Sequence, residues 1–277
     1  MAETADNEAV PDGMSLPEEI IRREDRLSAI AAAKVKIEAR ANERFEQETA
    51  VVQAKLNKRA AKSKETGKPP RGKPPAPPQA GPTDKDQVNL TDDESRIMKV
   101  SGGGFEQCYN AQVAVDMDSL LIVRTNTVQA CNDKQQIEPM LKKLEALPDE
   151  LGKVNALVAD TGFYSEANVN ACTAHDILPL IAVSREEHHP DPLKRFTEPP
   201  PLGACATVVD AMRHRLKTKE GRGLYAQRKC TVEPVIGIVK SVLGFRQFLL
   251  RGLDNVKGEW DLVALAWNLK RMYVLTG

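Results

Sequence analysis

The sequence lacks any paired cysteine motif. Its five cysteines are scattered, odd in number, and include no Cys-x-x-Cys pair. This pattern argues against a disulfide framework or a zinc site and favours a reducing, cytoplasmic compartment. A signal peptide and a long apolar span are also missing, because Asn268, Lys270 and Arg271 interrupt the apolar run from Leu262 to Leu275. We therefore expect a core helix there and no membrane partner.

The chain has no formal net charge, but its charged residues are unevenly distributed along the sequence. The chain has 39 Lys and Arg against 39 Asp and Glu, yet residues 211–277 hold 13 basic against 5 acidic side chains, a net of +8. A basic C-terminal part is typical of proteins that bind a polyanion such as DNA. Ordinary surface charge is the plainer alternative.

The N-terminal third shows three changes of composition. Residues 1–16 are polar, and we expect them to be disordered. Residues 17–62 have no glycine or proline after Pro17 and are rich in Ala, Glu, Lys and Arg, which predicts a long helix or a helical hairpin. Their heptads are too poor to favour a coiled coil. The next segment, 63–87, holds seven prolines between residues 63 and 84 and is expected to be a disordered linker.

Residues 88–277 alternate between strand and helix patterns, which predicts an α/β domain. We expect strands at 107–115, 120–128, 153–159 and 178–183, and helices at 133–147, 165–175, 207–217 and 254–275. Asp133 is the expected cap of the first of these helices. The last helix should pack inward through Trp260, Val263, Ala264, Trp267 and Met272.

One acidic residue follows a predicted buried strand. Asp160 comes directly after the apolar run that ends at Ala159, and Thr-Gly-Phe-Tyr-Ser follows it. The carboxyl end of such a strand is where α/β sheets carry functional side chains. A turn aspartate that only accepts backbone amides is the plainer alternative.

A second acidic residue lies in a basic setting further along the chain. Glu233 precedes Pro234, which suits the first turn of a helix, and Lys240 follows two turns later on a similar side. Tyr225, Arg228 and Lys229 lie just before it. A capped surface helix with a solvated Glu and Lys would explain the pattern without any function.

Three segments together resemble a known family. They are YNAQVAVD at 109–116, ADTGFYS at 159–165 and YAQRKCTVEPVIGIVK at 225–240. In this order they resemble the DDE-type transposases of bacterial insertion sequences, in the group with a Y-R-E-K signature. The resemblance covers about residues 88–275, and the N-terminal helix and linker resemble an insertion that some members carry.

The resemblance implies an RNase H-like fold, a mixed sheet with flanking helices, and phosphoryl transfer on DNA. Asp160 and Glu233 would be the second and third carboxylates that hold Mg²⁺ or Mn²⁺ for strand cleavage and transfer. Tyr225, Lys240 and either Arg228 or Lys229 would contact DNA. The signature spacing fits Lys229, whereas Arg228 is one residue too early, and both stay candidates. The implied partners are transposon ends, target DNA and a second copy in a homodimer.

The family's first carboxylate is the open question. It belongs on a first, central strand, yet we find only two strand patterns ahead of the helix at 133–147. Either the chain is a truncated copy without that strand, which we favour, or Asp116 in the hairpin turn serves instead. A truncated copy should bind DNA weakly and show no Mg²⁺-dependent cleavage. The alternative function is a non-catalytic DNA-binding accessory protein that uses only the basic C-terminal part.

Overall fold

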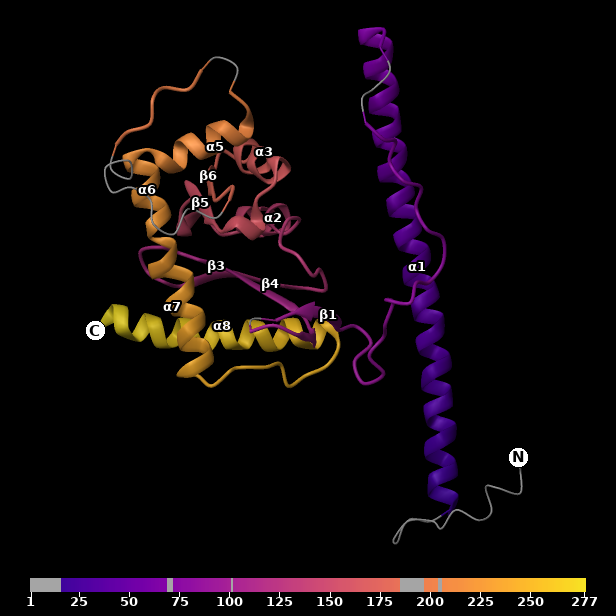
Figure 1. The fold of residues 1–277 in the computed structure, drawn as a ribbon. Coiled ribbons are helices and arrows are strands. Elements are labelled where there is room, and N and C mark those ends of the chain that lie inside the picture. The colour runs from indigo at the N-terminus through magenta and orange to yellow at the C-terminus, as the bar shows by residue number, and fades with distance from the viewer. Residues whose placement is uncertain (1–15, 69–71, 101, 185–196, 204–205) are drawn as a thin grey trace. The chain divides into compact units, whose positions relative to one another are not determined.

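The computed structural model describes residues 16–68, 72–100, 102–184, 197–203 and 206–277. It divides into two units, Met1–Glu94 and Ser95–Gly277 (Figure 1). Residues 1–15, which cover nearly all of the segment predicted to be disordered, lie outside the described part. No helix among the described residues has the length and apolar character that would span a membrane.

The first unit is built on one helix. Helix α1 runs without a break over Leu16–Thr66, a length of 51 residues. Most of its side chains are exposed, but Ala41 is fully buried. The chain turns back along α1 after Gly72, and Arg59 donates to the Gly72 carbonyl at 2.8 Å. Part of the proline-rich segment and the residues after it therefore lie against the helix.

An arginine and an aspartate fasten this returning segment. Arg44 Nη2 donates to Asp86 Oδ2 at 2.9 Å and to the Gly81 carbonyl at 3.2 Å. Hydrogen bonds from Arg44 and then from the Thr83 backbone lower the pKa of the Asp86 carboxyl to about 2. Asp93 adds a second attachment through Lys36. The segment is thus held at two points by charged pairs.

The second unit begins with two antiparallel strand pairs. Strand β1 (Arg96–Lys99) pairs with β2 (Phe105–Cys108), and β3 (Asn110–Val115) pairs with β4 (Ile122–Val128). Our expectation of only two strands ahead of the helix is wrong, since four precede it. Strand β1 was missed, and β2 and β3 were predicted as the single strand 107–115. The turn between β1 and β2 contains Gly102, Gly103 and Gly104, all with positive φ. Only Tyr109 separates β2 from β3.

The remaining strands form a parallel pair, β5 (Ala156–Ala159) and β6 (Leu178–Ile181). Three two-stranded sheets therefore occur in the described residues where we expected one mixed sheet. Side chains of the last helix form hydrogen bonds with backbone groups of the β3–β4 pair. Trp260 Nε1 donates to the Gln112 carbonyl, and the Asn268 side chain bonds both the N–H and the C=O of Ile122. The domain is mixed α/β, with small sheets.

The helices have mostly the expected positions. They are α2 (Ile137–Glu145), α3 (Glu166–Ala174), α5 (Val208–Lys217), α6 (Lys219–Ala226), α7 (Arg228–Ser241) and α8 (Leu253–Thr276), with short 3₁₀ turns η1 (Asp149–Leu151) and η2 (Thr161–Phe163). Ser165 and Thr207 cap α3 and α5 through their hydroxyl oxygens. Met272 does not pack inward as expected; it is 51% exposed.

Two hydrophobic clusters organise the second unit. The first joins α2, α3, α5 and β6 through residues such as Leu141, Cys172, Ile181 and Met212. The second joins α7 and α8 to the β3–β4 pair through Ile122, Val235, Val239, Trp260 and Trp267. In Figure 1, α8 runs along the β3–β4 pair, and the β5–β6 pair lies with α2, α3 and α5. Each predicted acidic residue thus has a separate cluster beneath it.

Candidate functional site

Asp160 lies directly after β5, as predicted. Its carboxylate oxygen Oδ1 accepts the Gly162 N–H at 2.9 Å and so caps η2. This is the hydrogen bond of the plainer turn aspartate. The residue is nonetheless exposed at the carboxyl end of a parallel strand pair, where the side chain can reach a ligand.

Asp133 has a different role from the one we predicted. Helix α2 begins at Ile137, and Asp133 does not cap it. Its Oδ1 instead accepts Asn110 Nδ2 at 2.7 Å and Gln112 Nε2 at 2.8 Å. Gln112 is only 7% exposed and is rigidly placed on β3. The sheet therefore fixes the orientation of this carboxylate.

Gly162 shows how close the two acids lie. A methyl group added at Gly162 would be 3.1 Å from Asp160 Oδ1 and 3.3 Å from Asp133 Oδ2. Both oxygens thus lie close to Gly162, and a side chain at this position would have to displace them by a few tenths of an ångström. Sequence reasoning missed this pairing, because the 26 residues between the acids gave no sign that their loops meet.

One buried amide holds the two acidic loops together. Asn168 of α3, 4% exposed, donates through Nδ2 to the Lys134 carbonyl at 2.8 Å and to the Phe163 carbonyl at 2.6 Å. Lys134 follows Asp133, and Phe163 is the last residue of the turn η2 that Asp160 caps. This side chain therefore links the two loops that carry Asp133 and Asp160.

A second group of candidate site residues lies on α6 and α7 and contains three residues of the signature, Tyr225, Arg228 and Glu233. We call it the second cluster of the site, and Asp133 with Asp160 the first. Arg228 Nη2 lies 3.1 Å from Glu233 Oε1, and the guanidinium carbon lies 5.9 Å from the centre of the Tyr225 ring. Arg228 Nε is buried and has no hydrogen-bond partner within the described part of the chain. Arg228, and not Lys229, is thus the basic residue that contacts both Tyr225 and Glu233.

Helix α7 begins earlier than we predicted. We expected Pro234 in the first turn, but the helix starts at Arg228 and Pro234 lies inside it. Proline has no N–H, so the bond to the carbonyl four residues earlier, that of Cys230, cannot form. The buried residues Val235 and Val239 hold the helix on the second core despite this loss. Lys229 and Lys240 lie exposed in its first and last turns.

Asp116 is a turn residue. Its Oδ2 accepts the Ser119 N–H at 2.9 Å and the Ser119 hydroxyl at 2.6 Å. These hydrogen bonds from Ser119 lower the pKa of the Asp116 carboxyl. The carboxylate stabilises the β3–β4 hairpin, and the acid that the structure places beside Asp160 is Asp133.

The two clusters remain separate in the structure. Among the described residues, no group of three or more His, Cys, Asp or Glu is arranged to hold a metal ion, so the structure does not bring Asp160, Asp133 and Glu233 together in one such group. The Asp133–Asp160 pair supplies carboxylate oxygens, which suit a hard ion such as Mg²⁺. These two residues thus have the oxygen ligands that a divalent ion prefers, but two carboxylates are fewer ligands than the ion needs.

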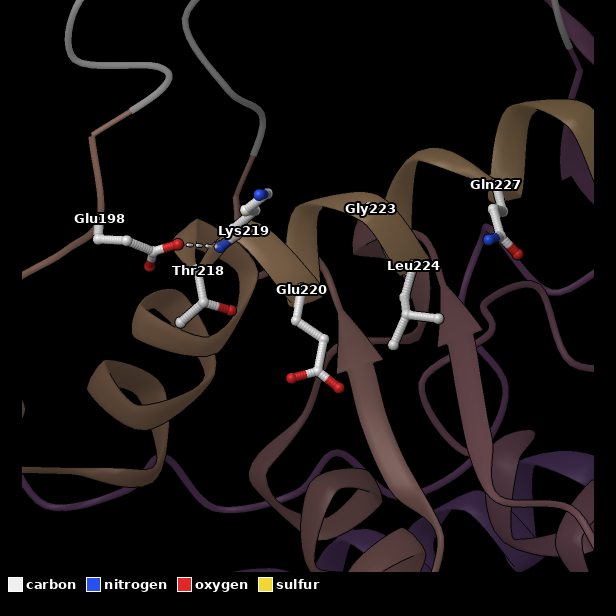
Figure 2. Close-up of a pocket in the computed structure, with 7 residues that line it drawn as sticks. All are labelled: Glu198, Thr218, Lys219, Glu220, Gly223, Leu224 and Gln227. Atoms are coloured by element: carbon white, nitrogen blue, oxygen red, sulfur yellow. Dashed lines mark hydrogen bonds between the residues drawn. The ribbon is translucent and has the colours of Figure 1, made fainter.

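An open pocket lies beside the second cluster (Figure 2). It has a volume of about 660 Å³ and is lined by Glu198, Thr218, Lys219, Glu220, Gly223, Leu224 and Gln227. Glu198 Oε1 accepts the Lys219 N–H at 2.7 Å at one side of it. The pocket contains none of the predicted site residues, so it adds no ligand to either cluster.

Comparison with known proteins gives one match. A family model described as a transposase DDE domain matches residues 204–273. The matched segment covers about the last quarter of the chain and includes Tyr225, Arg228, Glu233 and Lys240, but not Asp160. No curated protein and no solved structure matches the chain.

Proposed function

We propose that the chain is a DDE-type transposase, whose DDE domain model matches residues 204–273, and that it binds transposon DNA during insertion-sequence transposition. The observation that carries the proposal is the contact of Arg228 with both Tyr225 and Glu233 inside the matched segment. These are the residue types of the family signature, brought together by the junction of α6 and α7. The domain is proposed to be a variant of the RNase H-like fold.

DNA is proposed to bind along α6 and α7. The exposed Lys229 and Lys240 are free to approach phosphates, and Arg228 is oriented by Tyr225 and Glu233. The excess of 13 basic over 5 acidic residues in 211–277 strengthens the attraction of DNA to this part of the chain. We assign the signature's basic position to Arg228 because of its two contacts.

A divalent ion, Mg²⁺ or Mn²⁺, is proposed to bind at Asp160 and Glu233, with Asp133 beside Asp160. In the family such ions activate the attacking hydroxyl and stabilise the leaving oxygen during strand cleavage and transfer. The residues of this chain contribute by orienting carboxylates: Asn110 and Gln112 hold Asp133, and Arg228 holds Glu233. For one ion to bind to Asp160 and Glu233 together, Glu233 would have to approach Asp160, since the described residues contain no three-acid group.

DNA binding tests the first half of the proposal. Fluorescence anisotropy with a labelled duplex should show an affinity that falls steeply as salt rises. Arg228→Ala and Lys240→Ala should each weaken binding and lower the slope of log K against log salt by about 0.9 per lost phosphate contact. Lys142→Ala, an exposed lysine paired with Glu138 on α2, is the matched control. Binding that is unaffected by salt and by both variants would refute the proposal.

Metal binding tests the second half without any need for activity. Titration of the chain with Mn²⁺, followed by the electron paramagnetic resonance of the free ion, should give an affinity that Asp160→Asn and Asp133→Asn each reduce about tenfold or more. Asp116→Asn should leave it unchanged. Equal affinities in all four proteins would rule out the carboxylate site.

The non-catalytic accessory protein is the second candidate. It would use only the basic C-terminal part, where residues 211–277 hold 13 basic against 5 acidic side chains. This candidate predicts salt-dependent DNA binding that neither Mn²⁺ nor Asp160→Asn alters. Robust Mg²⁺-dependent strand cleavage that disappears in Asp160→Asn would exclude it.

A further inference from the structure

Helix α8 has two apolar faces, and only one of them is covered. Val256, Trp260, Ala264 and Trp267 are buried against the β3–β4 pair and α7. The other face carries Leu262, Leu265, Leu269 and Met272, which are 67%, 53%, 60% and 51% exposed. We call these four residues the outer seam. Their spacing of three, four and three residues is that of a coiled-coil contact line.

The polar neighbours of the outer seam already have partners within the second unit. Glu259 accepts the N–H groups of Leu249 and Leu250 at 2.9 and 3.0 Å. Asn268 is bonded to both backbone groups of Ile122, and Asp261 accepts the Thr125 hydroxyl. Covering the seam would therefore leave these groups satisfied, so the desolvation cost of an apolar contact here is low.

We propose that the outer seam binds the same seam of a second copy of the chain, with the two α8 helices antiparallel. In that arrangement Leu265 of each copy meets Leu269 of the other, and Leu262 meets Met272. The seam is thus complementary to itself under a twofold axis, which is the requirement for a closed dimer.

The available area agrees with a dimer. The outer seam together with Tyr273, which is 78% exposed, offers on the order of 500 Å² per copy, so that a twofold contact would bury about 1,000 Å². This is near the lower limit for a specific interface, so we expect a weak, concentration-dependent dimer. Dimerisation through this surface depends on neither DNA binding nor the metal site.

Sedimentation equilibrium of the full chain, without DNA or metal, tests the proposal. From about 1 µM upward the mass should rise from that of one 30.5 kDa chain to twice that value. The double variant Leu265→Glu, Leu269→Glu should weaken association by about 100-fold or more, because buried like charges would face each other. Leu151→Glu, at a leucine that is 70% exposed on η1, is the matched control and should dimerise normally.

Two results would overturn the dimer. One is a wild-type chain that stays monomeric up to concentrations of about 100 µM. The other is a charged double variant that dimerises as well as the wild type. Tryptophan fluorescence checks that each variant is folded, because both tryptophans lie on the buried face of α8. If the charged variant unfolds, Leu265→Asn with Leu269→Asn replaces it, and the same two results decide.

Discussion

At the scale of single residues, the acid pair depends on the absence of one methyl group. Gly162→Ala would place a carbon near both Asp133 Oδ2 and Asp160 Oδ1, at distances tighter than ordinary contact. We expect the two carboxylates to move apart and Mn²⁺ affinity to fall about tenfold. Gly223→Ala, where an added methyl meets nothing within 4 Å, is the control. Unchanged affinity in Gly162→Ala would mean that the pair does not share an ion.

Asp86 predicts a pH dependence for the first unit. Its folded-state pKa of about 2 lies below the ordinary value of 3.8, so the ionised form stabilises the folded state. This stability is fully present above pH 3.8 and is lost as the pH falls through about 2. We expect proteolysis by pepsin within residues 72–94 to accelerate over this interval.

Asp86→Asn separates this effect from general acid damage. The variant should be cleaved rapidly even at the upper end of the interval, because the amide cannot form the ion pair with Arg44. Cleavage at the same rate in both proteins would show that the Arg44–Asp86 pair does not hold the segment.

At the scale of elements, α8 fixes the edge of the β3–β4 pair through one amide. Asn268 bonds both the N–H and the C=O of Ile122 at 2.8 Å, and Ile122 is 6% exposed. Asn268→Ala would leave two buried backbone groups without a partner, at a cost of about 2–4 kcal/mol in the free energy of unfolding. Urea unfolding followed by tryptophan fluorescence measures it.

Asn255 provides the comparison on the same helix. Its side chain bonds only the Arg251 carbonyl near the exposed start of α8. Asn255→Ala should therefore change the free energy of unfolding by about 0.5 kcal/mol or less. An equal decrease in the free energy of unfolding in the two variants would show that the hydrogen bonds between Asn268 and Ile122 do not stabilise the fold.

Helices were the most predictable elements, and the reasons are local. Ser165 and Thr207 start their helices with capping hydroxyls that the sequence shows directly. Strand β1 was missed because four residues of mixed character carry almost no pattern. The start of α7 was placed too late, because proline favours a first turn on local grounds, whereas Val235 and Val239 bury the helix as a whole.

The candidate site was only partly predictable for a related reason. Asp160 and the Tyr225–Glu233 block can be found from the residues around them, because strand ends and signature spacing are local features. The sequence does not identify Asp133, Asn168 and Gln112 as site residues, since their roles depend on hydrogen bonds between loops and strands far apart in the sequence. Contacts of this kind are fixed by tertiary packing.

At the scale of the whole molecule, the two units should unfold separately. Helix α1 has almost no buried side chains, whereas the second unit contains both hydrophobic clusters. Both tryptophans lie on α8, so their fluorescence reports the second unit alone. On heating, we expect the far-ultraviolet circular dichroism to fall before the tryptophan emission shifts. A single coincident transition would mean that the units stabilise each other.

The two hydrogen bonds that Asn168 donates also restrict how the lengths of the acidic loops can vary among related sequences. The Asn168 amide donates to the carbonyl of the residue after Asp133 and to that of the last residue of η2. An insertion in either loop would therefore disturb one of these hydrogen bonds. Related sequences that lengthen one of these loops should therefore either replace this asparagine or adjust both loops together.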